Sequence, residues 1–346
     1  MKRFSYMAVL GWLMGIFCLM QNSWAARASA NQKAVHVVMA TDTIPVKPVK
    51  LPKGYTARIN TIYATHGAWQ GRMDLYIPGA PMQKGSPMAG TAPVLINIHG
   101  GAWTHGNKES QGGFSTFLKK GFLVANVEYR MSPIAKAPAA IQDVRCALLY
   151  LVQHATELNI DINKIVVMGA SAGGHLALMA GLLGSSNHAF DQNCLRQMPP
   201  QTKAAIKSET KTETETKTAS PFRIAAIIDK YGPTDLSIVS SLDHIKKSAY
   251  SWLGEGVKNP AFLRSISPLY YVDRHSPPVF IVHGDADPTV PYHQSELLHA
   301  KLDKAGVYNQ FVTVPGGLHG KFTQEQKKQL SQQIIAFLEQ CKVIAR

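Results

Sequence analysis

The chain has 346 residues, of which 45% are hydrophobic and 17% are charged. This composition excludes a fibrous protein and provides enough apolar residues for one large α/β domain with a substantial core. The formal net charge of +14 would favour anionic partners. No dense basic cluster is interleaved with aromatic residues, so we expect basic residues scattered over a solvated surface and no nucleic-acid binding.

Residues 1–30 have the pattern of a secretory signal peptide. Lys2 and Arg3 precede an apolar run from Met7 to Met20, and small residues follow it. The run is shorter than the ~20 apolar residues that a membrane span needs, and no later stretch is long enough to span a bilayer. We expect cleavage after Ala30, with Ala25 as the alternative, and an exported protein, periplasmic or secreted, that is not an integral membrane protein.

Three cysteines remain after residues 1–30: Cys146, Cys194 and Cys341. Because this number is odd, at most one disulfide can form within the chain. Cys146 lies in an apolar helical run, where we expect it to be a buried small hydrophobic side chain. Cys194 is expected in a loop and could pair with either of the other two.

The predicted elements begin with two segments, 57–63 and 72–77, that alternate apolar and polar residues. They are expected to form antiparallel strands at the edge of a sheet. Further strands are predicted at 93–98, 122–127, 165–168, 224–228, 278–282 and 310–314, and helices at 114–120, 139–157, 175–180, 292–304 and 324–341. This alternation predicts an α/β fold in residues 31–346, with a mostly parallel, doubly wound sheet covered on both faces.

Two segments depart from this alternation. Residues 199–220 are rich in threonine with alternating lysine and glutamate, and they have no apolar face to bury. We expect a flexible, low-complexity surface insertion there, with a solvated hairpin as the alternative. Residues 236–273 combine short helical pieces with several aromatic residues and could form a small cap.

The segment from Ile165 to Gly181 is typical of a nucleophile elbow. An apolar strand leads into Gly169, Ser171 and Gly173, which form the motif G-x-S-x-G, and a helix-forming run follows. Glycines are needed around such a serine, because side chains two residues away would collide in the sharp turn. The motif predicts that Ser171 is a nucleophile and that the N–H of Ala172 faces a developing oxyanion.

A histidine and a carboxylate are expected near Ser171, because functional groups of doubly wound sheets collect after the carboxyl ends of the strands. His319 lies between glycines after the last predicted strand. Asp285 and Asp287 both follow the preceding strand, and we favour Asp287 as the acid. The chain order of serine, aspartate and histidine is that of a hydrolytic triad.

The strand that ends at residue 98 runs into His99, Gly100 and Gly101. The backbone N–H groups of these glycines, together with that of Ala172, are candidates for an oxyanion hole. We expect His99 to brace this loop by hydrogen bonding. His175 is expected to pack on the elbow helix rather than to take part in chemistry.

Six motifs together carry a family resemblance, namely HGGAW at 99–103, EYR at 128–130, GASAGGH at 169–175, YGPTDL at 231–236, HGDADPTVP at 283–291 and GLHG at 317–320. The chain resembles exported α/β-hydrolases of the esterase/lipase group. It is similar to bacterial feruloyl-esterase-like (BD-FAE) and hormone-sensitive-lipase-like carboxylesterases. Ala102 replaces a glycine that is usual in the second family, and the acid motif also differs, so the first family is closer. The resemblance implies an α/β-hydrolase fold with Asp287 at the acid position.

We therefore expect a serine carboxylesterase that hydrolyses short-chain or aryl esters through an acyl-enzyme. Its substrate would be a small-molecule or polysaccharide-linked ester, and no cofactor or metal is required. One alternative is an amide hydrolase with the same triad, either kynurenine-formamidase-like or a peptidase. Another is a non-catalytic binding protein on the same fold, against which the three intact residues argue.

Overall fold

The computed structural model describes residues 49–79, 90–184, 189–197, 222–238 and 246–345. The expected signal peptide and the predicted insertion at 199–220 lie outside these residues. Within them, no helix is long and apolar enough to cross a membrane.

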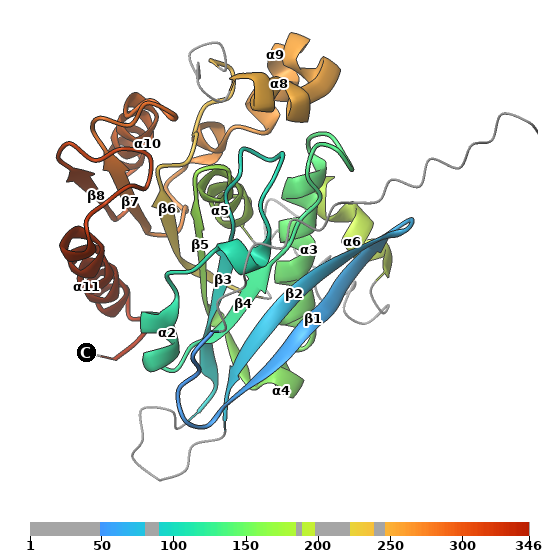
Figure 1. The fold of residues 1–346 in the computed structure, drawn as a ribbon, viewed down its shortest axis with the longest axis vertical. Helices are drawn as coiled ribbons and strands as arrows, with labels where there is room; N and C mark the ends of the chain where they lie inside the picture. The colour runs from blue at the N-terminus through green and yellow to red at the C-terminus, as the bar shows by residue number, and fades with distance from the viewer. Residues whose placement is uncertain (1–48, 80–89, 185–188, 198–221, 239–245, 346) are drawn as a thin grey trace, which may run out of the picture. The chain divides into compact units, whose positions relative to one another are not determined.

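The described residues form an eight-stranded sheet in the order β1-β2-β4-β3-β5-β6-β7-β8 (Figure 1). A hairpin of β1 (Tyr55–His66) and β2 (Trp69–Pro78) forms one edge, and β2 pairs antiparallel with β4 (Leu123–Val127). All later pairings are parallel and join β4 to β3 (Ala92–Ile98), β5 (Ile160–Ala170), β6 (Ile224–Lys230), β7 (Val279–Gly284) and β8 (Asn309–Val314). The predicted antiparallel edge and parallel centre are both confirmed.

Helices cover both faces of this sheet (Figure 1). The core on one face includes side chains of α3 (Ala139–Gln153), α5 (Ala172–Leu182) and α10 (His293–Lys304). The core on the other face includes side chains of α2 (Ser115–Lys119) and α11 (Gln324–Gln340). The described residues also contain the short helices α4 (Ala155–Leu158), α6 (Gln192–Gln197), α8 (Lys246–Leu253) and α9 (Pro260–Ser265), together with 3₁₀ helices at Lys108–Ser110, Ala189–Asp191, Gly254–Lys258 and Pro268–Tyr271. The doubly wound α/β architecture predicted from the sequence is therefore confirmed.

The helix predicted over residues 139–157 is interrupted. α3 ends at Gln153 and is followed by its C-cap residue His154, whose imidazole Nδ1 lies 2.8 Å from the carbonyl oxygen of Tyr150. The same carbonyl oxygen accepts the backbone N–H of His154 at 3.0 Å, so the backbone and the ring of His154 both contact the last turn of the helix. The short helix α4 then ends at Asn159, which has a left-handed conformation with φ 51°.

Cys146 is buried, as expected, but it is not a free side chain, and of the two partners left open for Cys194 it is the one that the structure shows. Cys146 forms a disulfide with Cys194 across a Cα–Cα distance of 5.3 Å, while Cys341 is free. Sequence reasoning placed Cys194 in a loop, but it lies in α6, which packs against α3. Next to the bridge, Arg145 and Asp191 form a fully buried ion pair with an Nη2–Oδ2 distance of 2.6 Å. The segment from Asp191 to Cys194, which includes the start of α6, is thus attached to α3 both covalently and electrostatically.

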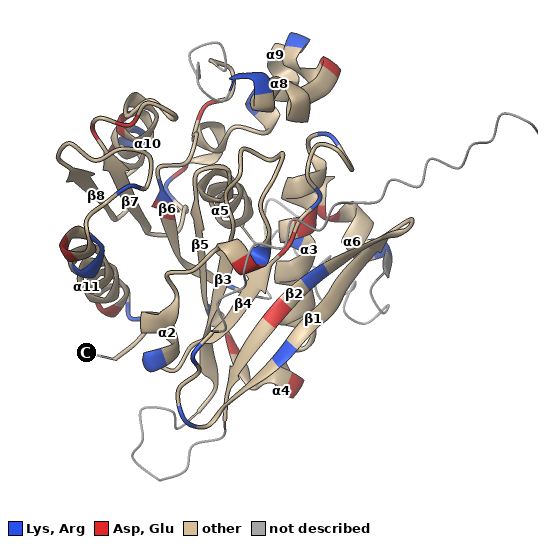
Figure 2. Cartoon of the chain, in the orientation of Figure 1, with Lys and Arg blue, Asp and Glu red and all other residues tan. Residues whose placement is uncertain are grey.

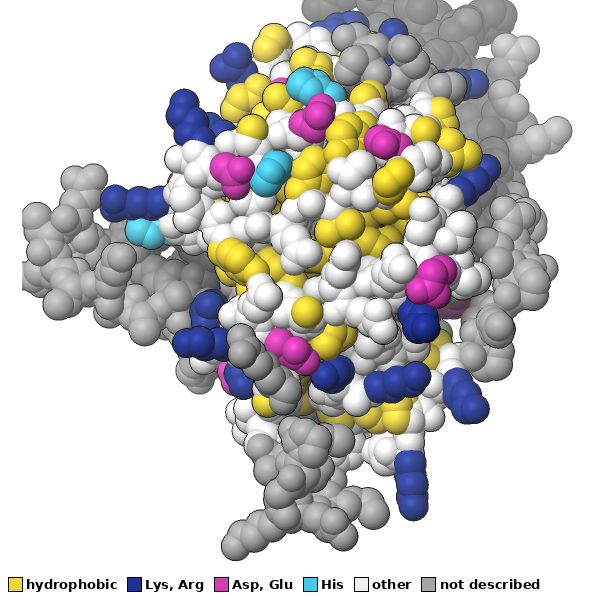
Figure 3. All heavy atoms as spheres, turned by 90° about the vertical axis from the view of Figure 1, so that its left-hand side faces the viewer, with side chains coloured by type: hydrophobic (Ala, Val, Ile, Leu, Met, Phe, Trp, Pro, Cys, Tyr) yellow, Lys and Arg dark blue, Asp and Glu magenta, His cyan; other side chains and the backbone are white. Residues whose placement is uncertain are grey.

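Charged residues are distributed over several elements rather than gathered on one (Figure 2). Figure 3 looks onto the left-hand side of Figure 1 and shows Lys and Arg side chains interspersed with acidic and hydrophobic ones. This distribution agrees with the expectation of scattered basic residues on a solvated surface.

Candidate active site

Ser171 occupies a strained turn between β5 and α5. Its backbone has φ 56° and ψ −124°, a region that non-glycine residues rarely adopt. The turn is closely packed, because a Cβ added to Gly173 would lie 2.3 Å from the carbonyl oxygen of Ile98. A Cβ on Gly169 would lie 2.1 Å from the Gly173 oxygen. The N–H of Ser171 donates to the carbonyl of Lys230 at 2.9 Å, which ties the turn to β6.

The structure brings Ser171, His319 and Asp287 together from three separate loops. The Nε2 atom of His319 lies 2.9 Å from Ser171 Oγ, and its Nδ1 atom lies 2.7 Å from Asp287 Oδ2. Because a carboxylate only accepts hydrogen bonds, Nδ1 carries the proton and Nε2 is left to accept the serine hydroxyl. The arrangement can therefore remove a proton from Ser171 during attack on a carbonyl carbon.

Asp287 is held by four donors. Its Oδ1 atom accepts from the N–H groups of Thr289 at 2.7 Å and Val290 at 3.1 Å, while His283 Nε2 lies 3.2 Å from Oδ2. Burial raises the pKa of Asp287, but the hydrogen bonds from His283 and His319 outweigh burial and hold that pKa well below its usual range. The side chain is therefore an anion that faces His319.

Asp285, the competing candidate, is placed elsewhere. It is exposed, and its Oδ1 atom accepts from the N–H of Gly316 at 2.7 Å. This bond secures the turn after β8. Asp287, rather than Asp285, thus makes the contact with His319.

Two further residues at the site were missed by sequence reasoning. His283 is fully buried, and its Nδ1 atom lies 2.7 Å from Ser295 Oγ, which orients the ring toward Asp287. The ring of Tyr231 packs edge-on against His319, with 4.9 Å between the ring centroids. Both residues stand inside motifs that the sequence displays, but nothing in the spacing shows that their side chains face the site.

The loop after β3 lies against the nucleophile elbow. A Cβ on Gly100 would be 2.8 Å from the carbonyl oxygen of Ala170 and 3.4 Å from Ser171 Cβ. Gly101 has φ 115°. In the part of the chain that the structure describes, the N–H groups of Gly100, Gly101 and Ala172 have no hydrogen-bond acceptor. Three donors are therefore available beside Ser171.

His99 braces the start of this loop, as predicted. Its Nδ1–H donates to the carbonyl oxygen of Gly100 at 2.7 Å, and its ring stacks on Tyr129 at 4.2 Å. The Tyr129 hydroxyl donates to the carbonyl oxygen of His99 at 3.1 Å. Burial lowers the pKa of His99 to about 4, so the imidazole is neutral at physiological pH and makes one fixed donation.

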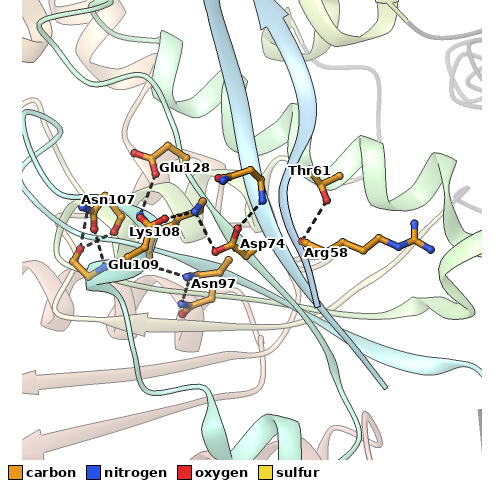
Figure 4. A network of polar contacts seen from close by, with 11 residues as sticks. Arg58, Thr61, Asp74, Asn97, Asn107, Lys108, Glu109 and Glu128 are labelled. Carbon is orange, nitrogen blue, oxygen red and sulfur yellow. Dashed lines mark hydrogen bonds and ion pairs between the residues drawn. The ribbon is translucent and has the colours of Figure 1, made fainter. Parts of the chain in front are cut away.

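Lys108 anchors the far end of the same loop (Figure 4). Its ammonium lies 3.1 Å from Asp74 Oδ2 on β2, and its backbone N–H donates to Glu128 Oε2 at 3.1 Å. Asn126 Nδ2 donates to the Lys108 carbonyl at 2.6 Å and is held in turn by Asn97. Lys108 is only 3% exposed. The segment from residue 99 to residue 108 is therefore held at both ends, which limits movement of the donors between them.

A buried aromatic cluster joins the elbow helix, this loop and helix α8. The Nε2–H of His175 donates to the carbonyl oxygen of Ile266 at 2.8 Å, so its Nδ1 atom accepts from Trp103 Nε1–H at 3.3 Å. Trp103 stacks on Trp252 of α8 with ring centroids 4.6 Å apart. Burial lowers the pKa of His175 to about 4. As predicted, His175 is a packing residue on the elbow helix. Through its hydrogen bond with Trp103 it also supports the loop after β3.

Among the described residues, no group of three or more His, Cys, Asp or Glu side chains is arranged to hold a metal ion.

The parallel sheet, the strained serine after β5, the acid after β7 and the histidine after β8 together define an α/β-hydrolase. The sequence model of the family described as BD-FAE matches residues 73–302, which is more than half of the chain. The chain therefore belongs to the BD-FAE family. A second model, described as TAP-like protein, matches residues 266–346.

Curated relatives carry esterase names. Esterase LipQ of Mycobacterium tuberculosis is 30% identical over 240 residues, which cover 66% of this chain and 50% of the relative. An arylesterase of Saccharolobus solfataricus is 27% identical over 243 residues, covering 69% and 72% of the two chains. The chain spans about half the length of the mycobacterial relatives LipQ and LipC that it matches, 50% and 53% respectively.

Solved structures share the fold. A truncated carbohydrate esterase from gut microbiota superposes with a TM-score of 0.62 at 27% identity, covering 85% of this chain and all of the other. An esterase from Thermogutta terrifontis, solved with propionate bound, gives a TM-score of 0.60 at 24% identity. The match covers 85% of this chain and 97% of the other. At that identity the second likeness concerns the fold alone.

Proposed function

We propose that this protein is a serine carboxylesterase. Ser171 Oγ attacks the ester carbonyl carbon while His319 Nε2 takes its proton, and His319 then returns the proton to the leaving alcohol. Water releases the acyl group from Ser171 by the same route in reverse. Asp287 keeps the imidazole in the required tautomer. The observation that carries the proposal is the pair of contacts made by His319, whose Nε2 atom lies 2.9 Å from Ser171 Oγ and whose Nδ1 atom lies 2.7 Å from Asp287 Oδ2.

The free N–H groups of Gly100, Gly101 and Ala172 are proposed to bind the oxyanion of the tetrahedral intermediate. Such donors are preorganised here, because the loop is anchored by His99 and Lys108 at its two ends. Loss of one oxyanion-hole donor typically raises the barrier by about 2.7–4 kcal/mol. Catalysis would therefore depend on the position of this loop as much as on the triad.

Short-chain or aryl esters, including esters attached to polysaccharide, are the proposed substrates. The names of two similar proteins support this class, one an arylesterase and the other a carbohydrate esterase. Since a shared fold alone does not establish a substrate, the class requires a direct test.

The test is hydrolysis of 4-nitrophenyl esters from acetate to palmitate by the purified protein. We expect turnover of the short esters that Ser171→Ala abolishes and that Ser331→Ala, a change on α11, leaves intact. Inactivity of the folded wild type on every chain length would refute the proposal. Matched amides belong in the same experiment, because faster cleavage of amides than of esters would favour an amide hydrolase. Labelling of Ser171 by a fluorophosphonate would exclude a role limited to binding.

We also propose that the protein is exported. The amino-terminal pattern supports this, and so does the Cys146–Cys194 disulfide, because such bridges persist mainly in oxidising compartments. Amino-terminal sequencing of the protein recovered from the periplasm or medium should begin at residue 31, or at residue 26 for the alternative cleavage site. Recovery of the full-length chain from the cytoplasm alone would contradict the proposal.

A further inference from the structure

Lys230 stands beside the nucleophile but has no role in the proposed mechanism. It is the last residue of β6, where the sheet register places it opposite Ala170, the residue before Ser171. Its carbonyl oxygen accepts the N–H of Ser171 at 2.9 Å. The main chain of Lys230 is therefore fixed to the elbow, and its side chain starts next to the site.

The side chains at the end of β6 point to opposite faces of the sheet. The carboxylate of Asp229 faces α5, since its Oδ1 atom accepts from Gly232 N–H at 3.0 Å and lies 2.4 Å from the position of a Cβ on Gly174. Because successive side chains of a strand alternate, Lys230 points to the other face. There its Nζ atom lies 3.7 Å from the position of a Cβ on Gly113, which is an exposed residue between the anchored loop and α2.

The ammonium of Lys230 lacks a counter-charge. Although the residue is partly buried, the described part of the chain contains no ion pair or hydrogen bond that its Nζ atom makes. Burial is what lowers the pKa of Lys230, to about 8, and no carboxylate acts against that effect. A partly dehydrated, unpaired charge is unfavourable for folding. Lys230 therefore differs from Lys108, whose buried ammonium is paired with Asp74.

We propose that Lys230 determines specificity by binding a carboxylate carried by the ester substrate. The preferred substrates would then be esters that bear a negative charge close to the scissile bond. A substrate carboxylate would supply the partner that the protein does not provide. This inference rests on the proposed esterase function and specifies its substrate class. Hydrogen bonds between charged groups are stronger than neutral ones, so we expect a preference of about 10- to 100-fold in kcat/KM.

The experiment compares anionic and neutral esters that are otherwise matched. One pair, 4-acetoxybenzoate and its methyl ester, carries the charge on the alcohol part. The other, 4-nitrophenyl hydrogen glutarate and 4-nitrophenyl pentanoate, carries it on the acyl part. The ratio of kcat/KM values within a pair is measured for the wild type, Lys230→Met, Lys230→Arg and Lys321→Met. Lys321 is the matched control, because it is an exposed lysine close to His319 in sequence.

We expect Lys230→Met to lower the ratio by about 10- to 100-fold in one of the two pairs, which identifies the part of the substrate that Lys230 contacts. Lys230→Arg should retain most of the preference, Lys321→Met should retain all of it, and added salt should weaken it. Lys230→Met should also melt no lower than the wild type, because it removes an unpaired charge.

An unchanged ratio in both pairs, or a loss of the preference in Lys321→Met instead, would overturn the inference. Marked destabilisation or failure to fold of Lys230→Met would also overturn it, because the lysine would then have a partner within the protein. Turnover of the neutral esters by the wild type tests the proposed esterase function independently of Lys230, so failure of this inference can be told apart from failure of that function. If neutral and anionic esters are both left intact by the folded wild type, the esterase proposal itself fails.

Discussion

The disulfide between Cys146 and Cys194 should make a large contribution to stability. The bridge closes a loop with a sequence separation of 48 residues. In the chain-entropy model, such a cross-link removes enough freedom from the unfolded state to stabilise the fold by about 4 kcal/mol at 25 °C. For a chain of this length, the entropy of unfolding converts that figure into a melting temperature about 6 °C lower when the bridge is absent.

The perturbation is the double variant Cys146→Ala, Cys194→Ala, compared with the wild type by urea unfolding and by thermal melting. Cys341→Ala is the matched control, and it should change the unfolding free energy by no more than about 0.5 kcal/mol. Reduction of the unfolded wild type should release two additional titratable thiols, because one bridge opens. A double variant whose unfolding free energy lies within about 1 kcal/mol of the wild type would refute the loop-closure reasoning.

Three further predictions concern the site. Asp287→Asn should lower kcat by about 10⁴-fold, because an amide does not hold the imidazole in the required tautomer, whereas Asp285→Asn should retain most activity; equal losses would reassign the acid. Gly100→Ala places a Cβ 2.8 Å from a main-chain oxygen beside the nucleophile, so kcat should fall by about 10²- to 10³-fold while circular dichroism shows an intact fold. A kcat close to that of the wild type would remove this loop from the oxyanion hole. Burial lowers the pKa of His175 to about 4, below the value of about 6.5 in an unfolded chain, so its contribution to stability is complete above about pH 6.5 and is lost as the pH falls toward 4. The contribution of Asp229 to stability has the opposite pH dependence, because burial raises the pKa of Asp229 to about 8. This contribution is lost as the pH rises through that value. His175→Gln should therefore reduce the difference in unfolding free energy between pH 6.5 and pH 4 by roughly 3 kcal/mol relative to the wild type, and parallel curves in urea unfolding would contradict this reasoning.

Much of the fold could be predicted because its strands are apolar and short, and because they alternate with helices. The elbow could also be predicted, because the turn around Ser171 leaves no room for side chains at the neighbouring glycines and these glycines are visible in the sequence. Asp287 was harder to separate from Asp285, because both follow β7 within three residues. The two aspartates are distinguished only by the geometry of the turn, in which the N–H of Asp287 donates to the carbonyl of Gly284 at 3.2 Å.

Other features depend on register between distant segments and could not be predicted. Lys108 stands in a polar stretch that indicates an exposed loop, yet it is buried because Asp74 projects from the edge hairpin at the right position on β2. The disulfide depends in the same way on how α6 packs against α3. Local patterns contain no information about such pairings, because the partners lie 34 and 48 residues apart.

The stacked indoles of Trp103 and Trp252 have a consequence for how substrate enters. An outward swing of α8 would separate the two rings and would pull on the hydrogen bond from Trp103 to His175. The loop that carries the donors of Gly100 and Gly101 would lose one of its supports in the same movement. Helix α8 is thus part of the scaffold that supports the proposed active site, and it is ill suited to act as a gate. An enzyme built in this way has its reactive geometry assembled before substrate arrives, so its turnover should show no activation when ester concentrations pass from dissolved monomers to aggregates or an oil–water interface.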